Sequence, residues 1–157
     1  MLMQSTSNMK NAQKEQVFKK EPIYIDANCF IYASLSKEEI GQKAKEILKQ
    51  VKSGVYKKAY SSTLTIDEFL WSVQKEVGRD LAAEGAGIFL NLQNFELISI
   101  DAQIISKAIE LYKEQKLDPR DAIHLAAMLS KNVKILVSSD SDFDKVRSIK
   151  RIDFSKE

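Results

Sequence analysis

The sequence predicts an α/β fold in three layers, with a mostly parallel sheet covered by helices on both faces. Apolar runs alternate with amphipathic stretches of helical length from Pro22 onward. Connections of that length allow the right-handed crossovers that join parallel strands. The runs are continuously apolar, as burial on both faces of a sheet requires. A three-layer α/β/α domain follows from these observations.

The strands are expected where the apolar runs are short and rich in β-branched residues. The first run stops at Asp26, and the later ones end at similarly polar positions. In chain order the expected strands are residues 23–25, 58–62, 95–100 and 133–138, with 151–154 as a candidate for a fifth.

The helices in the first half of the chain are expected from periodicity and from glycine positions. Gly54 suits the C-terminal cap of a helix over residues 37–52, and Gly78 separates helices at 65–77 and 81–92. The apolar face of the first of these helices consists of Ile40, Ala44, Ile47, Leu48 and Val51.

Two further helices are expected from their N-terminal signals. Asp101 is a suitable N-cap for a helix whose inner side is expected to carry Ile104, Ile105, Ala108, Ile109 and Tyr112. Asp118 and Pro119 open the next helix, since proline is favoured at the first helical position, where its missing N–H costs nothing.

Composition and length are those of one soluble globular domain. The chain has 157 residues, of which 44% are hydrophobic and 29% charged. No apolar run is long enough to span a bilayer, and the single cysteine excludes a disulfide framework. Residues 1–20 lack hydrophobic periodicity and an apolar signal-peptide core, so a flexible extension is expected before a domain at 21–157. A cytoplasmic location is the default expectation.

The net charge of +2 is unevenly distributed. Residues 1–20 hold four lysines and one glutamate, so they contribute +3 and the remainder contributes −1. A near-neutral domain lacks the basic stripe of a tight, non-specific nucleic-acid binder. Metal ions and local basic residues would have to offset an acidic site if the substrate were a nucleic acid.

Acidic residues occur where strand-like runs end or where the following helices begin. They are Asp26, Glu68, Asp121 and Asp140. Ligands of open parallel sheets bind beyond the carboxyl ends of the strands, so one edge can bring all of these carboxylates together. Grouped carboxylates repel one another unless a cation neutralises them. Oxygen ligands without a Cys/His cluster favour Mg²⁺ or Mn²⁺ and, with them, phosphodiester hydrolysis.

Four segments around these acids resemble the motifs of PIN-domain ribonucleases, in particular VapC-type toxins and stand-alone archaeal relatives. The segments are IDANCFIY (25–32), STLTIDE (62–68), DPRDAIHLA (118–126) and LVSSDSDF (136–143). The resemblance runs from about Ile23 to the C-terminus. It implies a parallel five-stranded sheet in the order 3-2-1-4-5, Mg²⁺- or Mn²⁺-dependent cleavage of RNA, and often a homodimer.

The resemblance also assigns roles to individual residues. Asp26, Glu68, Asp121 and Asp140 match the catalytic, metal-binding acids. Asp142 matches a position that is often acidic and that assists the metal site in some members. Asn28 and Ser138 match polar positions that orient the acids or the attacking water.

Each acid except Asp26 also has a simpler structural explanation. Glu68 could close a capping box with Thr65, and Asp121 could assist the cap of its helix. Asp140 and Asp142, with Asp144, could form a solvated turn. His124 lies one helical turn from Asp121, but a lone histidine among apolar neighbours is more often a satisfied, half-buried side chain, so it is left out of the catalytic set.

The leading hypothesis is a metal-dependent endoribonuclease, with the toxin of a toxin–antitoxin pair as one form of it. An antitoxin protein would then be a partner besides the RNA substrate, and no membrane is involved. The alternative is a PIN-like module that binds RNA or protein with little or no turnover. The sequence identifies neither the RNA target nor the number of metal ions.

Overall fold

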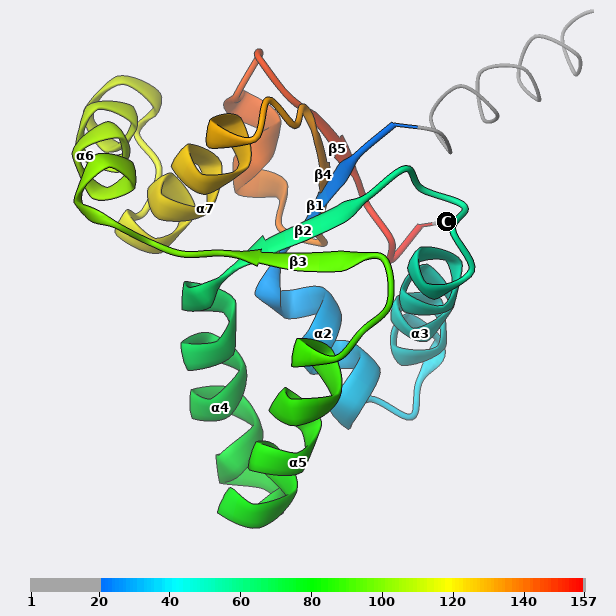
Figure 1. Ribbon diagram of the computed structural model, residues 1–157. Helices are drawn as coiled ribbons and strands as arrows, with labels where there is room; N and C mark the ends of the chain where they lie inside the picture. Colours follow the sequence, from blue (N-terminus) through cyan, green and yellow to red (C-terminus); the bar gives the residue numbers. More distant parts are fainter. Residues whose placement is uncertain (1–20, 157) are drawn as a thin grey trace, which may run out of the picture.

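The computed structural model describes residues 21–156 as a layered α/β domain (Figure 1). The extension expected at residues 1–20 lies outside the described residues. In chain order the elements are β1 (Ile23–Ile25), α2 (Ala27–Leu35), α3 (Glu39–Lys52), β2 (Ala59–Ser62), α4 (Thr63–Val77), α5 (Arg79–Leu90), β3 (Phe95–Ile98), α6 (Ala102–Gln115), α7 (Pro119–Ser130), β4 (Ile135–Val137), the 3₁₀ helix η1 (Ser141–Lys145) and β5 (Lys150–Ile152).

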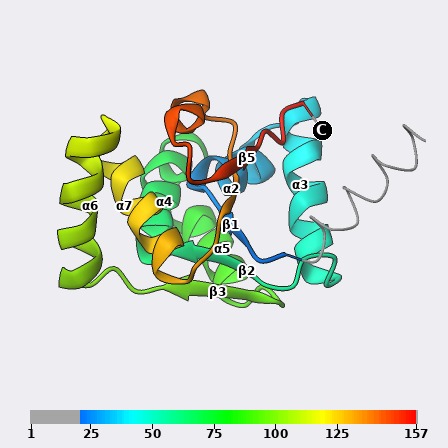
Figure 2. The same ribbon diagram turned by 90° about the horizontal axis from the view of Figure 1, so that it is seen from above.

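The five strands form one parallel sheet in the order β3-β2-β1-β4-β5, which confirms the predicted fold (Figure 2). The chain builds outward from β1 to β3 and then crosses back to place β4 on the other side of β1. Strand order therefore reverses between β1 and β4, where Ile25 is in register with Val137. This reversal point is where open α/β sheets bind their ligands.

Helices cover both faces of the sheet, with α2–α5 on one side and α6 and α7 on the other (Figure 1). Alternate residues of β1 point to opposite faces: Ile23 and Ile25 join the core beneath α2–α5, and Tyr24 joins the core beneath α6 and α7. All of β1 and β4 is buried, which explains their continuously apolar sequences.

The expected boundaries largely agree with the structure. All five strands and every predicted helix are present. β1 has the expected bounds, β2, β3 and β4 are shorter than expected by one, two and three residues, and β5 begins one residue earlier and ends two residues earlier than expected. Gly54 and Gly78 adopt positive φ angles of 75° and 86° beside the helix ends where they were expected.

Asp101 caps α6, since its side chain accepts a hydrogen bond from the Ile104 N–H. On α6, Ile105, Ile109 and Tyr112 are exposed rather than buried as expected, because the contact with α7 covers only the narrower face that carries Ile104, Ala108 and Leu111.

Helix α2 was not predicted, because the segment after Asp26 does not have the polar face of an exposed helix. Its residues Ala27, Cys29, Phe30 and Ala33 are buried. The helix packs between the sheet, α3 and α4, so it is apolar on more than one side and lacks a clear amphipathic pattern. The 3₁₀ helix η1 was also unpredicted and replaces the expected turn at residues 140–144.

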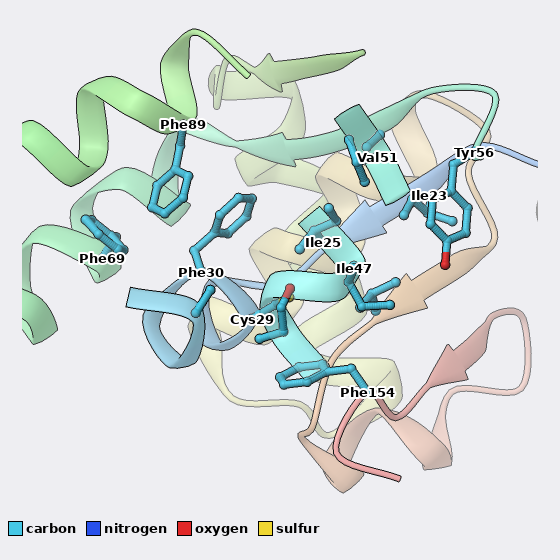
Figure 3. Close-up of a cluster of buried hydrophobic side chains, with 14 of the residues drawn as sticks. Ile23, Ile25, Cys29, Phe30, Ile47, Val51, Tyr56, Phe69, Phe89 and Phe154 are labelled. Atoms are coloured by element: carbon cyan, nitrogen blue, oxygen red, sulfur yellow. The ribbon is translucent and has the colours of Figure 1, made fainter. Parts of the chain in front are cut away.

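Aromatic rings fill the core beneath α2–α5 (Figure 3). Phe89 on α5 lies between Phe30 on α2 and Phe69 on α4, with ring centroids 4.6 and 4.8 Å away. These contacts fix α2 against the α4–α5 pair, and they thereby fix the position of Asp26 at the start of α2. No helix in the described part of the chain has the length and apolar character needed to cross a membrane.

We expect Phe89→Ala to lower the free energy of unfolding by about 3–5 kcal/mol, because it leaves a cavity between two other rings. The neighbouring residue Ile88 is 66% exposed, so Ile88→Ala is the matched control, with an expected change within about 0.5 kcal/mol. Urea denaturation followed by circular dichroism measures both. Equal losses for the two variants would contradict this description of the core.

Candidate active site

The carboxyl edge of the sheet positions the acids singled out in the sequence. Asp26 directly follows β1 and stands at the N-terminus of α2, where its backbone N–H donates to the Val137 carbonyl of β4. Glu68 lies on α4, Asp121 in the first turn of α7, and Asp140 at the start of η1. Segments far apart in the sequence thus deliver carboxylates to the point where strand order reverses.

Ser138 is the centre of a hydrogen-bond network around Asp26. Its hydroxyl donates to Asp26 Oδ2 at 2.6 Å and accepts from Asn28 Nδ2 at 3.1 Å and from the Asp140 backbone N–H at 3.0 Å. A hydroxyl has one donor and two acceptor positions, so Ser138 is fully used. The structure therefore places Asn28 and Ser138 where they orient Asp26 and Asp140.

Asp26 is buried, with 7% of its surface exposed. Burial raises the pKa of Asp26, and the nearby charge of Glu68 raises it further, while His124 and the hydrogen bond from Ser138 lower it. The net direction is upward. A carboxyl group that resists ionisation here marks a place where negative charge is incompletely compensated.

Glu68 contacts His124 and does not form the capping box considered above. Helix α4 begins at Thr63, so Thr65 lies inside the helix, and its hydroxyl pairs with the Ser61 hydroxyl instead. Glu68 Oε2 lies 2.6 Å from His124 Nε2. The carboxylate therefore points toward the sheet edge and away from the start of its own helix.

His124 is fully buried, whereas the sequence suggested half-burial. Its Nδ1 lies 2.7 Å from the Tyr24 hydroxyl, and its Nε2 lies 3.9 Å from Asp26 Oδ1 in addition to the Glu68 contact. Burial acts to lower the pKa of His124, but Tyr24, the hydrogen bond to Glu68 and the charge of Asp26 together raise that pKa well above its ordinary value. Both ring nitrogens have hydrogen-bond partners, which confirms the expectation that His124 is a satisfied side chain. His124 also lies beside two of the candidate site acids.

The second part of the site is formed by Asp121, Asp118 and Asp142, each with a carboxylate oxygen within 4.8 Å of the others. Burial, followed by the charges of Asp140 and Asp26, raises the pKa of Asp121 from 3.8 to about 7. Asp118 occupies the N-cap position of α7, but its side chain makes no cap hydrogen bond. Its carboxylate joins this acidic group instead.

Asp140 stands at the start of η1 and near Asp121. Its side chain caps η1 by accepting from the Asp142 N–H at 2.9 Å, where the sequence suggested a solvated turn. It is also close enough to Asp121 to raise the pKa of that residue. Asp140 is thus held rigidly by Ser138 and by η1 while facing the other acids.

Arg151 on β5 supports this loop and was missed in the sequence. Its guanidinium donates to the Ser138 carbonyl at 3.0 Å and to both carboxylate oxygens of Asp144, and it pairs with Asp153 at 3.1 Å. Asp144, expected to be a surface residue, is exposed but paired. The contacts of Arg151 depend on the pairing of β5 with β4, and the sequence signal for a strand at 151–154 is weak, so this role could not be predicted.

The donor set fits a hard divalent cation. Asp26 and Glu68 each place a carboxylate oxygen within 4.8 Å of the other and of a His124 ring nitrogen, and burial together with neighbouring carboxylates raises the pKa values of Asp26 and Asp121. Among the described residues, the buried side-chain atoms without a hydrogen-bond partner are Asn28 Oδ1 and Ser62 Oγ. Asn28 lies in the first turn of α2 and Ser62 is the last residue of β2, and oxygen donors are what Mg²⁺ and Mn²⁺ take.

The model of the PIN domain family matches residues 23–149. This range includes Asp26, Glu68, Asp118, Asp121, Asp140 and Asp142. Comparison with curated protein sequences found no match.

Solved structures with the same fold include toxins and toxin–antitoxin complexes at low sequence identity. VapC20 of Mycobacterium tuberculosis, described as a sarcin-ricin loop cleaving toxin, has a TM-score of 0.67 at 16% identity, over 80% of this chain and 95% of its own. VapBC2 of Rickettsia felis, solved with a promoter DNA fragment, has a TM-score of 0.65 at 16% identity, covering 83% and 97%. A toxin–antitoxin complex from Klebsiella pneumoniae has a TM-score of 0.60 at 22% identity, over 81% of this chain and 94% of its own.

We expect Asp121→Asn to stabilise the metal-free protein at pH 8 and not at pH 4. The folded protein keeps a proton on Asp121 that the unfolded chain releases between about pH 4 and pH 7, so wild-type stability falls across that window. The gain at pH 8 should be roughly 1–2 kcal/mol, allowing for the solvent that reaches this half-buried group.

Urea denaturation at both pH values, in buffer with chelator, measures the effect. Glu84→Gln on the exposed face of α5 is the matched control, with no pH-dependent gain expected. A gain from Asp121→Asn that is the same at both pH values would show that charge at this position is not the cause.

Proposed function

The chain belongs to the PIN domain family, and we propose that it is a divalent-metal-dependent endoribonuclease that hydrolyses RNA phosphodiester bonds. The observation that carries this proposal is the meeting of Asp26, Glu68, Asp121 and Asp140 where strand order reverses, together with the raised pKa values of Asp26 and Asp121. Such a group favours a site that is complete only when a cation is bound.

Asp26 and Glu68 would hold the ion, assisted by Asp121 and Asp140, with Asp142 at the outer side. A bound Mg²⁺ or Mn²⁺ supplies a Lewis acid for the phosphate and lowers the pKa of water. Ser138 keeps one Asp26 oxygen fixed, so that less reorganisation is needed when substrate binds. Asn28 holds Ser138 and presents its free carbonyl oxygen at the same edge.

The RNA substrate is supported by the family and by exposed basic residues near the carboxyl edge. Arg120 on α7, Lys145 at the end of η1 and Arg147 are exposed. They follow or adjoin the acidic segments in sequence, and cationic side chains beside a carboxylate centre can bind the phosphates that flank a scissile bond.

We propose further that the protein acts in the cytoplasm as the toxin of a toxin–antitoxin pair. The support is that the structural neighbours include VapBC complexes from Rickettsia felis and nontypeable Haemophilus influenzae. An antitoxin that places a basic side chain against the acids would silence the site by charge neutralisation.

A homodimer is supported by an apolar groove on the face that α6 and α7 share. The groove has a volume of about 220 Å³ and is lined in part by Ile109 and Tyr112, which are 64% and 51% exposed. Exposed apolar side chains grouped in this way are typical of protein interfaces.

We expect Asp26→Asn to reduce RNA cleavage at least 100-fold, because it removes one charge of the metal site without changing side-chain volume. Cleavage of short RNAs in Mn²⁺ should also stop when chelator is added. Asp67→Asn, an exposed neighbour of Glu68 on the same helix turn, is the control, and its rate should equal that of the wild type.

Mn²⁺ calorimetry and the RNA cleavage assay together distinguish a nuclease from the alternative, a module that binds RNA or protein. Calorimetric Mn²⁺ binding without chelator-sensitive cleavage would favour the binding module. Wild-type cleavage by the Asp26→Asn protein, with contaminating nuclease excluded by a parallel purification, would show that the proposed mechanism is wrong.

We expect Ile109→Lys to convert the homodimer into a monomer, because it places a charge in the apolar groove of α6. Sedimentation velocity measures the change. Leu81→Lys on α5 is the control, since Leu81 is similarly exposed at 57% but lies outside the groove. A wild-type protein that sediments as a monomer at high concentration would contradict the dimer.

A further inference from the structure

A buried hydrogen-bonded chain runs from the centre of the sheet to the metal-binding edge. It consists of Tyr24 on β1, His124 on α7 and Glu68 on α4. Tyr24 is completely buried and His124 is 1% exposed, whereas Glu68 retains 16% exposure of its side chain. These hydrogen bonds therefore connect the buried core to Glu68, whose carboxylate remains partly accessible to solvent.

The Tyr24 hydroxyl faces one ring nitrogen of His124, and Glu68 faces the other. Within residues 21–156 the hydrogen-bond partner of this hydroxyl is His124 Nδ1 at 2.7 Å. In the neutral ring the Tyr24 O–H donates to Nδ1, so the ring proton is on Nε2. In the doubly protonated ring Nδ1–H donates to the Tyr24 oxygen and Nε2 also carries a proton, so both forms present an N–H group to Glu68.

That N–H group is directed at the Glu68 carboxylate. The distance of 2.6 Å between Nε2 and Oε2 is short for a hydrogen bond and typical of a charge-assisted pair, whereas Asp26 Oδ1 at 3.9 Å is outside hydrogen-bond range. A ring nitrogen that donates a proton has no lone pair for a metal ion. His124 is therefore unsuited as a ligand, although it lies within ligand distance of two carboxylates.

We propose that His124 is a positioning residue, held by Tyr24, that fixes the Glu68 carboxylate through an Nε2–H donor so that the other Glu68 oxygen is presented to the metal ion. The inference rests on the proposed function, because it assigns Glu68 to a divalent cation. A free glutamate has several rotamers, and freezing them costs binding energy unless the fold has already done so. Support of this kind changes metal affinity by about 10- to 100-fold in other metal sites.

The first test observes the ring itself. His124 is the only histidine in the sequence, so its ring ¹⁵N signals in the metal-free protein are assigned without ambiguity. The expected spectrum shows a proton on Nε2 between pH 6 and pH 9, coupled across a hydrogen bond to a carboxylate. A deprotonated Nε2, or a metal-induced shift typical of direct coordination at Nε2, would overturn the proposal.

The second test compares substitutions by Mn²⁺ calorimetry. His124→Leu, which removes the donor but fills the space, should weaken Mn²⁺ binding about 10- to 100-fold. His124→Gln, which can place an amide N–H near the position of Nε2, should restore most of that affinity. Tyr24→Phe keeps the histidine and should give an intermediate loss, while Tyr32→Phe, a partly exposed tyrosine on α2, should give none.

Thermal unfolding in chelator identifies any variant that fails to fold, and His124→Gln and Tyr24→Phe keep the proposal testable if His124→Leu is lost. Equal Mn²⁺ affinities for the wild type, His124→Leu and Tyr24→Phe would show that the chain is only structural. If the affinities change as expected but the wild-type protein cleaves no RNA, the positioning role stands and the nuclease proposal fails. If the wild-type protein cleaves RNA and the variants bind Mn²⁺ as tightly as the wild type, the nuclease proposal stands and the positioning role fails.

Discussion

Two adjacent parallel strands, β1 and β4, end at the same edge of the sheet, and each is followed there by a carboxylate, Asp26 and Asp140. The helices that flank this edge add Glu68 and Asp121. At a typical effective dielectric constant, two carboxylates about 4 Å apart repel by roughly 4 kcal/mol, whereas a hydrogen bond to a charged group contributes about 1.5–3 kcal/mol. Burial is the largest cause of the raised pKa values of Asp26 and Asp121, and the charges of the neighbouring carboxylates add to it.

The neighbouring residues respond to this charge by holding each acid in one orientation. Ser138 holds Asp26 and Asp140, Arg151 holds the carbonyl of Ser138, and His124 holds Glu68. Asp121 lacks a comparable partner among the described hydrogen bonds, and its pKa rises to about 7. These hydrogen bonds fix the orientation of Asp26 and Glu68 in the protein without a bound cation.

The packing of the hydrophobic cores positions residues at the carboxyl edge of the sheet. Phe30 and Phe89 fix α2 against α5, and α2 begins at Asp26. Tyr24 points into the opposite core and reaches His124 there. Tyr24 and Asp26 are two residues apart and therefore face the same way, since side chains alternate along a strand, and both lie beside His124. The shared fold with VapC proteins at 15–22% identity shows that this framework tolerates extensive change in sequence.

The sequence by itself determined the elements whose signals are local. Continuous apolar runs fixed the strands, apolar periodicity and glycines fixed α3 to α5, and Asp101 and Pro119 marked the starts of α6 and α7. It also identified the four acids, because a carboxylate at the end of a buried run is visible without a structure. Only the tertiary structure revealed α2 as a helix, since its burial on several sides removes the amphipathic pattern. Only the tertiary structure, too, showed that Glu68 contacts His124 and forms no capping box, and that Arg151 bonds to the loop at Ser138. The physical reason is that Tyr24 and His124 are 100 residues apart, and Glu68 and His124 are 56 apart, so their contacts exist only after the sheet has brought their helices and strands together.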